Sequence, residues 1–357
     1  MPHQFSAGRA TAAFDQDHTL RVVIEMSLST WLVTGMLPGF ERQPLKKLQP
    51  DPDLLWPLID RWRQECQASG QEISRLVVAY EAGRDGFWLA RLLGAHGVEA
   101  HVIHSSSVAV SRDRRRAKTD RLDAALLLRV LLGWLHGEAG HCSMAATPSV
   151  EDEDARRPTR ERENLVGERT RIINRMKAAF ARLGIRDVNP AQRKAFEKLD
   201  GLRTPEGGSI PPLAMAELRR DMARLRFVED QIKEIEQQRM VRLDEAKPDE
   251  ERANGMVRLL SRVAGIGVET ADMLVHEIFL RNLRDRRAVA LYAGLTGSPD
   301  ESGSKRRERG LSRAGNPRVR RGMVQLAWRF LVFQKDCALV RCFGRAPLMQ
   351  QVGGECR

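Results

Sequence analysis

Four acidic side chains from three separate parts of the sequence stand where a metal-dependent site could form. Glu25 and Glu81 each follow a short apolar run, and Asp120 and Asp123 lie three residues apart at the start of an apolar helix. Clustered carboxylates repel one another unless a cation holds them, and Mg²⁺ or Mn²⁺ is the natural occupant. Two such ions about 3.5–4 Å apart can clamp the attacking and leaving oxygens of a phosphodiester. Any one of these acids alone would be a surface or capping residue, so only their joint placement predicts a metal site.

An α/β pattern must position these acids. Apolar runs predict buried strands at residues 20–24, 31–36, 75–80 and 99–104, with a weaker one at 43–48, and helices are expected at 51–66, 87–96 and 120–134. Thr119 stands where the N-cap of the last helix belongs. In open α/β sheets, ligands bind beyond the carboxyl ends of the strands. We therefore predict a central mixed sheet with the acids gathered at one edge.

The composition points to a polyanionic partner. The 357 residues carry a net charge of +12, which favours nucleic acid and says little about fold. The five cysteines include no CxxC pair, so neither a disulfide framework nor a zinc site is indicated and the reducing cytoplasm fits best. No apolar run is long enough for a membrane span or a signal peptide, so we expect no membrane partner.

Residues 151–248 change character, because strands disappear and charged residues dominate. Sparse apolar positions at helical spacing predict two long amphipathic helices joined by residues 188–212. Such helices often pair as a coiled coil, and we interpret the region as a dimerisation element. The alternative is a solvated helical hairpin without that role.

The region from residue 255 to residue 335 combines a glycine turn with basic segments. Gly265 and Gly267 match a helix-hairpin-helix turn, which presents backbone N–H groups to a DNA phosphate. The sequence of residues 292–321 predicts a glycine- and serine-rich loop flanked by arginines. Such a loop is suited to contact with phosphate groups. The alternatives are a turn that touches no DNA and a solvated loop. The expected nucleic-acid contacts are Arg114, Arg115, Arg116, Lys118, Gly265, Gly267, Lys305, Arg306, Arg307, Arg313, Arg318 and Arg320.

Together these motifs resemble those of insertion-sequence transposases with a RuvC-like DEDD nuclease domain, a family that includes bridge-RNA-guided serine recombinases and pilin-gene invertases. VVIEMS is similar to the first acidic strand of that family, YEAGRDGFWL to the second and KTDRLDA to its paired aspartates. RVAGIGVETA, YAGLTGSPDESG and LSRAGNPRVRR are similar to its helical transposase domain. The six motifs occur in the same order between about residue 21 and residue 334, which makes the resemblance specific.

The resemblance implies an Mg²⁺-dependent recombinase, with Mn²⁺ as a possible substitute. It assigns the metal to Glu25, Glu81, Asp120 and Asp123, and makes Ser302 a nucleophile that forms a transient phosphoserine bond to DNA. From the residues alone, Ser298, Ser304 and Ser312 are equally eligible. The resemblance also implies a structured guide RNA and a homo-oligomer, a dimer or a tetramer, in which the serine meets acids of a different subunit.

The resemblance further implies a division into domains. A RuvC/RNase H-like α/β domain is expected at residues 18–145, a helical coiled-coil region at 151–248 and an all-α helix-hairpin-helix domain at 255–335. Residues 336–357 lack helical periodicity, and we interpret them as a truncated tail.

One residue departs from the family pattern. Glu25 stands where the family usually has aspartate, and its extra methylene requires the backbone to lie further from an ion with near-ideal octahedral geometry.

Two other functions are alternatives to a recombinase. The first rival is a metal-dependent, structure-specific endonuclease, which needs the acids but not Ser302. The second is an inactive truncated copy that only binds nucleic acid.

Overall fold

The computed structural model describes residues 14–81, 83, 86–104, 107–108, 120–138, 142–195, 197–245, 252–281, 283–302, 305–338 and 340–341. For residues 120–121, 193, 252, 298–302 and 305–309 the description covers the backbone alone. The chain divides into two compact units, residues 1–151 and residues 152–357. Within the described ranges, no helix is both long and apolar enough to cross a membrane.

A six-stranded mixed sheet forms the centre of the first unit. Its strands are β1 (Thr19–Met26), β2 (Trp31–Met36), β3 (Leu45–Leu48), β4 (Arg75–Glu81), β5 (Glu99–Ile103) and β6 (Met144–Ala145). They are arranged in the order β3-β2-β1-β4-β5-β6, in which β1, β4 and β5 are parallel and the other pairings are antiparallel. The mixed α/β sheet expected from the sequence is confirmed. Strand β6 was not predicted, because two residues are too few to form a recognisable pattern.

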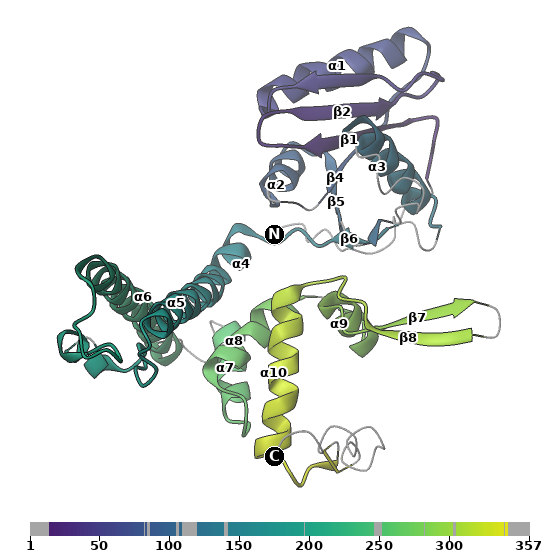
Figure 1. The fold of residues 1–357 in the computed structure, drawn as a ribbon. Coiled ribbons are helices and arrows are strands. Elements are labelled where there is room, and N and C mark those ends of the chain that lie inside the picture. The colour runs from purple at the N-terminus through teal and green to yellow at the C-terminus, as the bar shows by residue number, and fades with distance from the viewer. Residues whose placement is uncertain are drawn as a thin grey trace. The chain divides into compact units, whose positions relative to one another are not determined.

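Helices cover both faces of this sheet (Figure 1). Helices α1 (Pro52–Ala68) and α2 (Trp88–Ala95) pack on the face that carries Val22 and Ile24. Helix α3 (Asp120–Leu135) packs on the opposite face, against Val23 and Ala79. Because successive strand side chains point to opposite faces, a strand covered on both sides reads as a continuous apolar run. This two-sided burial explains why the strand positions could be predicted.

A partly buried ion pair joins β4 to β5 and makes the stability of the first unit depend on pH. Arg75 donates two hydrogen bonds to Glu99, at 2.7 and 2.8 Å, and His101 lies 2.8 Å from the same carboxylate. Burial alone would raise the pKa of Glu99, but the hydrogen bonds from His101 and Arg75 outweigh it and lower the pKa to about 2.

We expect this pair to stabilise the unit above the ordinary glutamate pKa and to lose its effect as pH falls from about 4.5 towards about 2. The unfolded chain binds the proton first, so acidification favours unfolding. In Glu99→Gln, the free energy of unfolding in urea should fall less steeply between pH 5 and pH 3 than in the wild type, as followed by tryptophan fluorescence. An unchanged slope would rule out this role.

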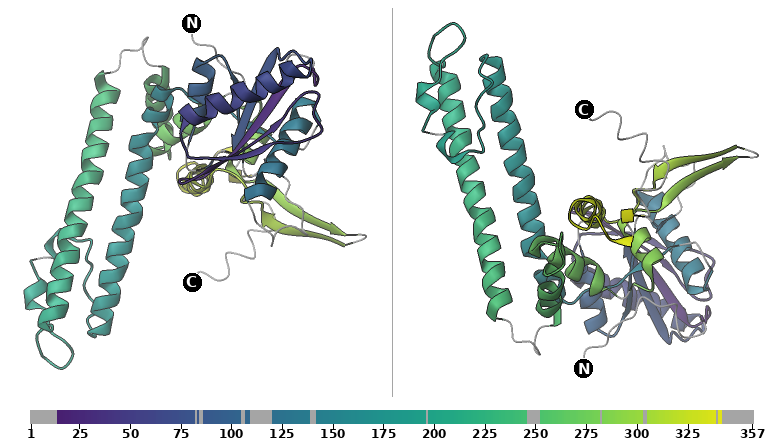
Figure 2. Two further views of the ribbon diagram at one scale, coloured as in Figure 1. Left: turned by 90° about the horizontal axis from the view of Figure 1, so that it is seen from above. Right: turned by 90° about the horizontal axis from the view of Figure 1, so that it is seen from below.

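The second unit contains a long helical pair. Helix α5 (Arg157–Arg182) follows the short α4 (Val150–Ala155) and lies beside α6 (Pro212–Glu245), as Figure 2 shows. Between them, residues 183–211 contain the single 3₁₀ turns η3 (Arg193–Ala195) and η4 (Leu199–Gly201). Met176 and Phe180 of α5 pack against Met222 of α6, and Arg175 holds Asp221 through bonds of 2.6 and 2.8 Å. The expected long helices are present, and pairing with a second chain stays a prediction.

A group of shorter helices follows in the same unit. These are α7 (Arg252–Ser261), α8 (Val268–Leu274), one π-helical turn η5 (Val275–Phe279), α9 (Arg286–Ala293) and α10 (Pro317–Phe333). Val257, Ala271, Val275, Ala293 and Val319 form the centre of their common core. The expected tail, residues 336–357, lies mostly outside the described residues.

Between α9 and α10, strands β7 (Gly297–Ser302) and β8 (Lys305–Leu311) form an antiparallel hairpin that extends away from these helices (Figure 1). The expectation of a loop over residues 292–321 is therefore wrong for these strands, and so is the expectation of an all-α domain at residues 255–335. The sequence of the hairpin, GSPDES and KRRERGL, has no alternating apolar residues, and alternation is the signal by which a strand is recognised. Backbone pairing joins the two strands.

Candidate active site

Glu25 and Glu81 lie at the same level on adjacent parallel strands. Ile24 of β1 pairs with Tyr80 of β4, so the two glutamates are the next residues along each strand. Neighbouring strands are about 4.8 Å apart. Two residues earlier, Val23 and Ala79 both belong to the core beneath α3. Because strand side chains alternate, both carboxylates stand on the face that α3 covers, and both residues are partly buried.

Helix α3 directs its first turn to the same edge of the sheet. At its far end, the ring of His136 meets that of Phe14, which precedes β1, with centroids 4.6 Å apart. The amino end of the helix therefore lies towards the carboxyl ends of β1 and β4. Leu127 and Leu131 are buried against the sheet, and Asp123 lies one turn before Leu127 on the same helical face. Asp120, seven residues before Leu127, shares that face by position.

The donor set at this edge suits a hard divalent cation. Glu25, Glu81 and Asp123 offer the carboxylate oxygens that Mg²⁺ prefers. Among the side chains that the structure describes, no group of three His, Cys, Asp or Glu residues is gathered as a metal site. The side chain of Asp120 and all of Thr119 lie outside the description. The structure thus brings the acids to one edge, and their joint binding of an ion stays a prediction.

Ser302 ends β7 and pairs with Lys305 across the hairpin. Of the other serines considered, Ser298 lies on the same strand, and Ser304 falls outside the described residues. The Ser312 hydroxyl lies next to β8 and accepts a hydrogen bond of 3.2 Å from the Thr296 hydroxyl. Ser302 is therefore the serine furthest along the first strand of the hairpin among those described.

The glycine turn lies between two helices, as expected. Gly265 has a φ of +91°, and Gly267 is the N-cap residue of α8. The turn also contacts the end of α10, where the Gln334 side chain donates a 3.0 Å hydrogen bond to the carbonyl of Ala264. Contact of these glycines with DNA stays a prediction.

The expected basic contacts have different surroundings. Arg114, Arg115, Arg116 and Lys118 lie outside the described residues, and for Lys305, Arg306 and Arg307 only the backbone of β8 is described. Arg313 is exposed and has a left-handed backbone, with φ at 55°.

Two of the expected basic contacts are engaged within the second unit. The Arg318 guanidinium pairs with Glu163 of α5, and that of Arg320 donates to the carbonyls of Ala293 and Arg313 at 3.3 and 3.0 Å. Both side chains therefore hold helices together in this structure, a role that the sequence did not predict.

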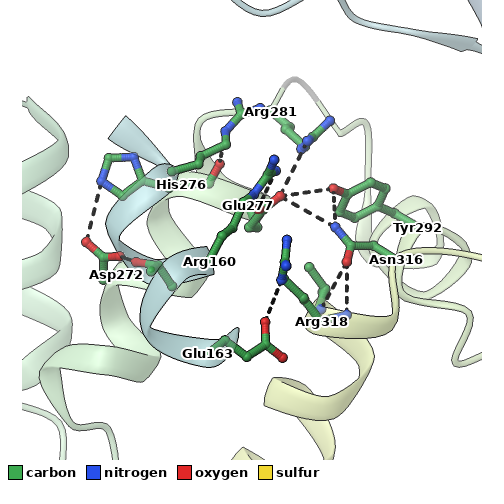
Figure 3. Close-up of polar contacts among 12 residues, drawn as sticks. Arg160, Glu163, Asp272, His276, Glu277, Arg281, Tyr292, Asn316 and Arg318 are labelled. Carbon is green, nitrogen blue, oxygen red and sulfur yellow. Dashed lines mark hydrogen bonds and ion pairs between the residues drawn. The ribbon is translucent and has the colours of Figure 1, made fainter. Parts of the chain in front are cut away.

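A buried polar network around Glu277 also went unpredicted (Figure 3). Glu277 lies on η5 and is 3% exposed. Its carboxylate accepts hydrogen bonds from Arg160 at 2.8 Å, from Tyr292 at 3.3 Å and from Arg281 at 3.4 Å. Asn316 in turn donates to the Tyr292 hydroxyl at 2.8 Å. One carboxylate thus connects α5, η5, α9 and the start of α10.

Opposing effects set the protonation of this network. Burial alone would raise the pKa of Glu277, but the hydrogen bond from Arg160 and the nearby arginine charges outweigh it and lower that pKa. Burial lowers the pKa of His276, which lies 3.6 Å from Asp272, although the Asp272 carboxylate opposes this effect. A carboxylate inside the apolar run MLVHEIF was the available signal for such a network.

Comparisons with known proteins agree with this arrangement. A profile of the transposase IS116/IS110/IS902 family matches residues 257–340, and the DEDD transposase profile of IS110 elements matches residues 58–184. "Putative transposase y4rJ" of Sinorhizobium fredii is 37% identical over 328 residues, which cover 89% of this chain and 82% of that protein. The chain belongs to the IS110/IS116/IS902 family of transposases. The transposase for insertion sequence element IS1328 of Yersinia enterocolitica is 30% identical over 184 residues, about half of each chain.

The matched regions cover several of the candidate residues, and Glu25 lies before both of them. The DEDD profile spans Glu81, Asp120 and Asp123, and the second profile spans Ser302 together with the Glu277 network. This transposase therefore acts on DNA, and the mixed α/β domain is consistent with a RuvC-like nuclease fold.

Proposed function

We propose that this transposase cuts and rejoins DNA strands at the ends of its own insertion sequence. Glu25, Glu81, Asp120 and Asp123 would hold Mg²⁺, or Mn²⁺ in its place, and Ser302 would be the nucleophile. The cation, when bound, supplies charge stabilisation at the phosphate that reacts. The carboxylates orient it and keep the edge of the sheet negatively charged until it binds.

The shared level of Glu25 and Glu81 carries this proposal. Two partly buried carboxylates on neighbouring strands repel each other, and the facing helix adds Asp123 to the same side. Carboxylate oxygens gathered in this way are the ligands that a hard divalent cation prefers. The pattern therefore favours a metal site over a structural role for the acids.

The serine step conserves phosphodiester bonds. Ser302 loses its hydroxyl proton, and its oxygen bonds to phosphorus as the P–O bond of the DNA strand breaks. The leaving oxygen takes up a proton and becomes a free DNA hydroxyl. A hydroxyl of the second strand then attacks the phosphoserine, which rejoins the DNA and restores the serine. No external energy source is needed, because each broken ester is replaced by another.

The partners follow from the same proposal. DNA phosphates would contact the basic segments, including the side chains of β8 and the glycine turn before α8. A structured RNA from the same element would choose the sites by base pairing, while the protein reads duplex shape and backbone. Pairing of α5 and α6 with their counterparts would assemble a dimer or a tetramer.

Replacing Ser302 by alanine tests the nucleophile. We expect complete loss of the covalent protein–DNA adduct and of joined products, with DNA binding retained. The measurement is a denaturing gel of the full chain incubated with element DNA, its flanking transcript and Mg²⁺. Ser298→Ala, on the same strand, is the matched control and should form adducts at the wild-type rate.

The same experiment separates the two rivals. An endonuclease would continue to cut DNA after Ser302→Ala, without adducts in either protein. A protein that only binds nucleic acid would neither cut nor form adducts before the substitution. Either outcome would contradict the proposed strand transfer.

A further inference from the structure

The base of the β7–β8 hairpin, defined as residues 294–296 and 311–313, is held by hydrogen bonds between its two sides. The Ser312 N–H donates to the carbonyl of Thr296 at 2.9 Å, and the Arg313 N–H donates to that of Gly294 at 3.2 Å. Gly294 also ends α9 with a left-handed φ of 66°. The hairpin is therefore joined to α9 by a short junction that these two backbone hydrogen bonds hold together, and not by a loose loop.

The backbones at this base lie in direct contact. A Cβ atom on Gly315, whose φ is +149°, would lie 2.5 Å from the Tyr292 carbonyl and 2.7 Å from the Gly294 nitrogen. The Asn316 N–H donates to the same Tyr292 carbonyl at 2.7 Å. A residue with a side chain would not fit at Gly315, so the segment between β8 and α10 packs directly against the end of α9.

Asn316 has two separate tasks at this junction. Its side-chain oxygen accepts from the backbone N–H groups of Arg318 at 3.0 Å and Val319 at 3.4 Å, which caps α10. Its side-chain nitrogen donates to the Tyr292 hydroxyl at 2.8 Å. The Tyr292 hydroxyl then donates to Glu277, which Arg160 and Arg281 hold in place (Figure 3).

The length of the hairpin makes its direction critical. At about 3.3 Å per residue, β7 places Ser302 roughly 20 Å from the base. A tilt of about 3° at the base would therefore move Ser302 by roughly 1 Å. A misplacement of that size can slow a reaction about 100-fold.

We propose that Tyr292, Asn316 and Glu277 are positioning residues that fix the direction of the β7–β8 hairpin and thereby the placement of Ser302. This inference rests on the proposed function, since it assumes that Ser302 is the nucleophile. The three residues lie on η5, on α9 and at the N-cap of α10, outside the two strands of the hairpin. They act through the base of the hairpin.

Two conservative substitutions test this role in the full chain. Tyr292→Phe removes only the hydroxyl, and Asn316→Ser keeps a capping oxygen for α10 but loses the donor to Tyr292. At saturating element DNA with its flanking transcript and Mg²⁺, we expect each variant to form the protein–DNA adduct about 10–100-fold more slowly. The DNA dissociation constant should stay within about twofold, because the basic side chains are unchanged.

The double variant distinguishes positioning from general destabilisation. Both substitutions break the same chain of hydrogen bonds, so the double variant should be no slower than the slower single one. Amide hydrogen exchange provides a second readout: the N–H groups of Ser312 and Arg313 should exchange faster, while those of α5 and α6 keep their rates. Glu206→Gln, exposed in the segment between α5 and α6, is the control and should match the wild type.

Several outcomes would overturn the inference. Adduct formation at the wild-type rate in both variants, or unchanged exchange at the hairpin base, would contradict it. Additive losses in the double variant would indicate independent structural effects and also contradict it. Ser302→Ala is measured alongside: if it abolishes the adduct while Tyr292→Phe and Asn316→Ser do not affect it, the inference fails and the proposed function stands. Adducts that persist in Ser302→Ala would overturn both.

Discussion

Glu81→Gln is expected to reduce DNA cleavage by about 10²–10³-fold or more, while the affinity for DNA stays unchanged. Glutamine keeps the shape of the side chain at the end of β4 but removes its charge, so the cation loses a ligand beside Glu25. The measurement is the rate of strand nicking at saturating DNA and fixed Mg²⁺, with binding followed by gel shift. The basic segments that are proposed to contact phosphate are not altered.

The matched control is Glu72→Gln, an exposed glutamate of the same unit, which should cleave at the wild-type rate. Metal binding provides an independent readout, because titration with Mn²⁺ in the absence of DNA should show weaker binding in Glu81→Gln than in the control. Normal cleavage and normal Mn²⁺ binding in Glu81→Gln would remove the metal site from consideration.

Glu277→Ala is expected to destabilise the second unit by about 3–5 kcal/mol, because it leaves the partly buried charges of Arg160 and Arg281 without their buried counter-ion. The loss affects Arg281 most, because only 15% of its side chain is exposed to solvent. Glu277→Gln should cost less, because the amide oxygen can still accept hydrogen bonds. The measurement is urea unfolding followed by the helical circular dichroism signal.

Acidification should reproduce part of this effect. The pKa of Glu277 is below its ordinary value, so its contribution is present above the unfolded pKa and is lost as pH falls through the folded one. Glu234→Ala, exposed on α6, is the control and should change the free energy of unfolding by less than about 0.5 kcal/mol. A similarly small effect of Glu277→Ala would show that the network is dispensable.

The first unit could be predicted well from the sequence because a strand that is buried on both faces of a sheet has a continuous run of apolar residues. The runs around Val22 and Val78 are apolar at every position except Arg21, and an acid follows each run. The edge of the sheet at which Glu25 and Glu81 meet followed from that order. The sequence could not show that the two glutamates lie at the same level, because this depends on which strands are neighbours and on their register.

The second unit was less predictable because polar residues carry much of its architecture. Helical spacing indicated α5 and α6, but the strands of the hairpin have no apolar alternation, and their pairing depends on backbone bonds. The apolar run around Glu277 indicates burial, but it does not indicate the partner Arg160, which lies 117 positions earlier in the chain. Partners so distant in sequence leave no local pattern.

The pairing of Ile24 with Tyr80 determines which length changes this protein can tolerate. Inserting or deleting one residue within β1 or β4 would turn either Glu25 or Glu81 to the side covered by α1 and α2, where no other candidate ligand stands among the described residues. The turn at residues 27–30 comes after Glu25, so a change of length there leaves both acids in phase. Natural variation in this family should accordingly avoid single-residue insertions and deletions within these two strands and permit them in the turn.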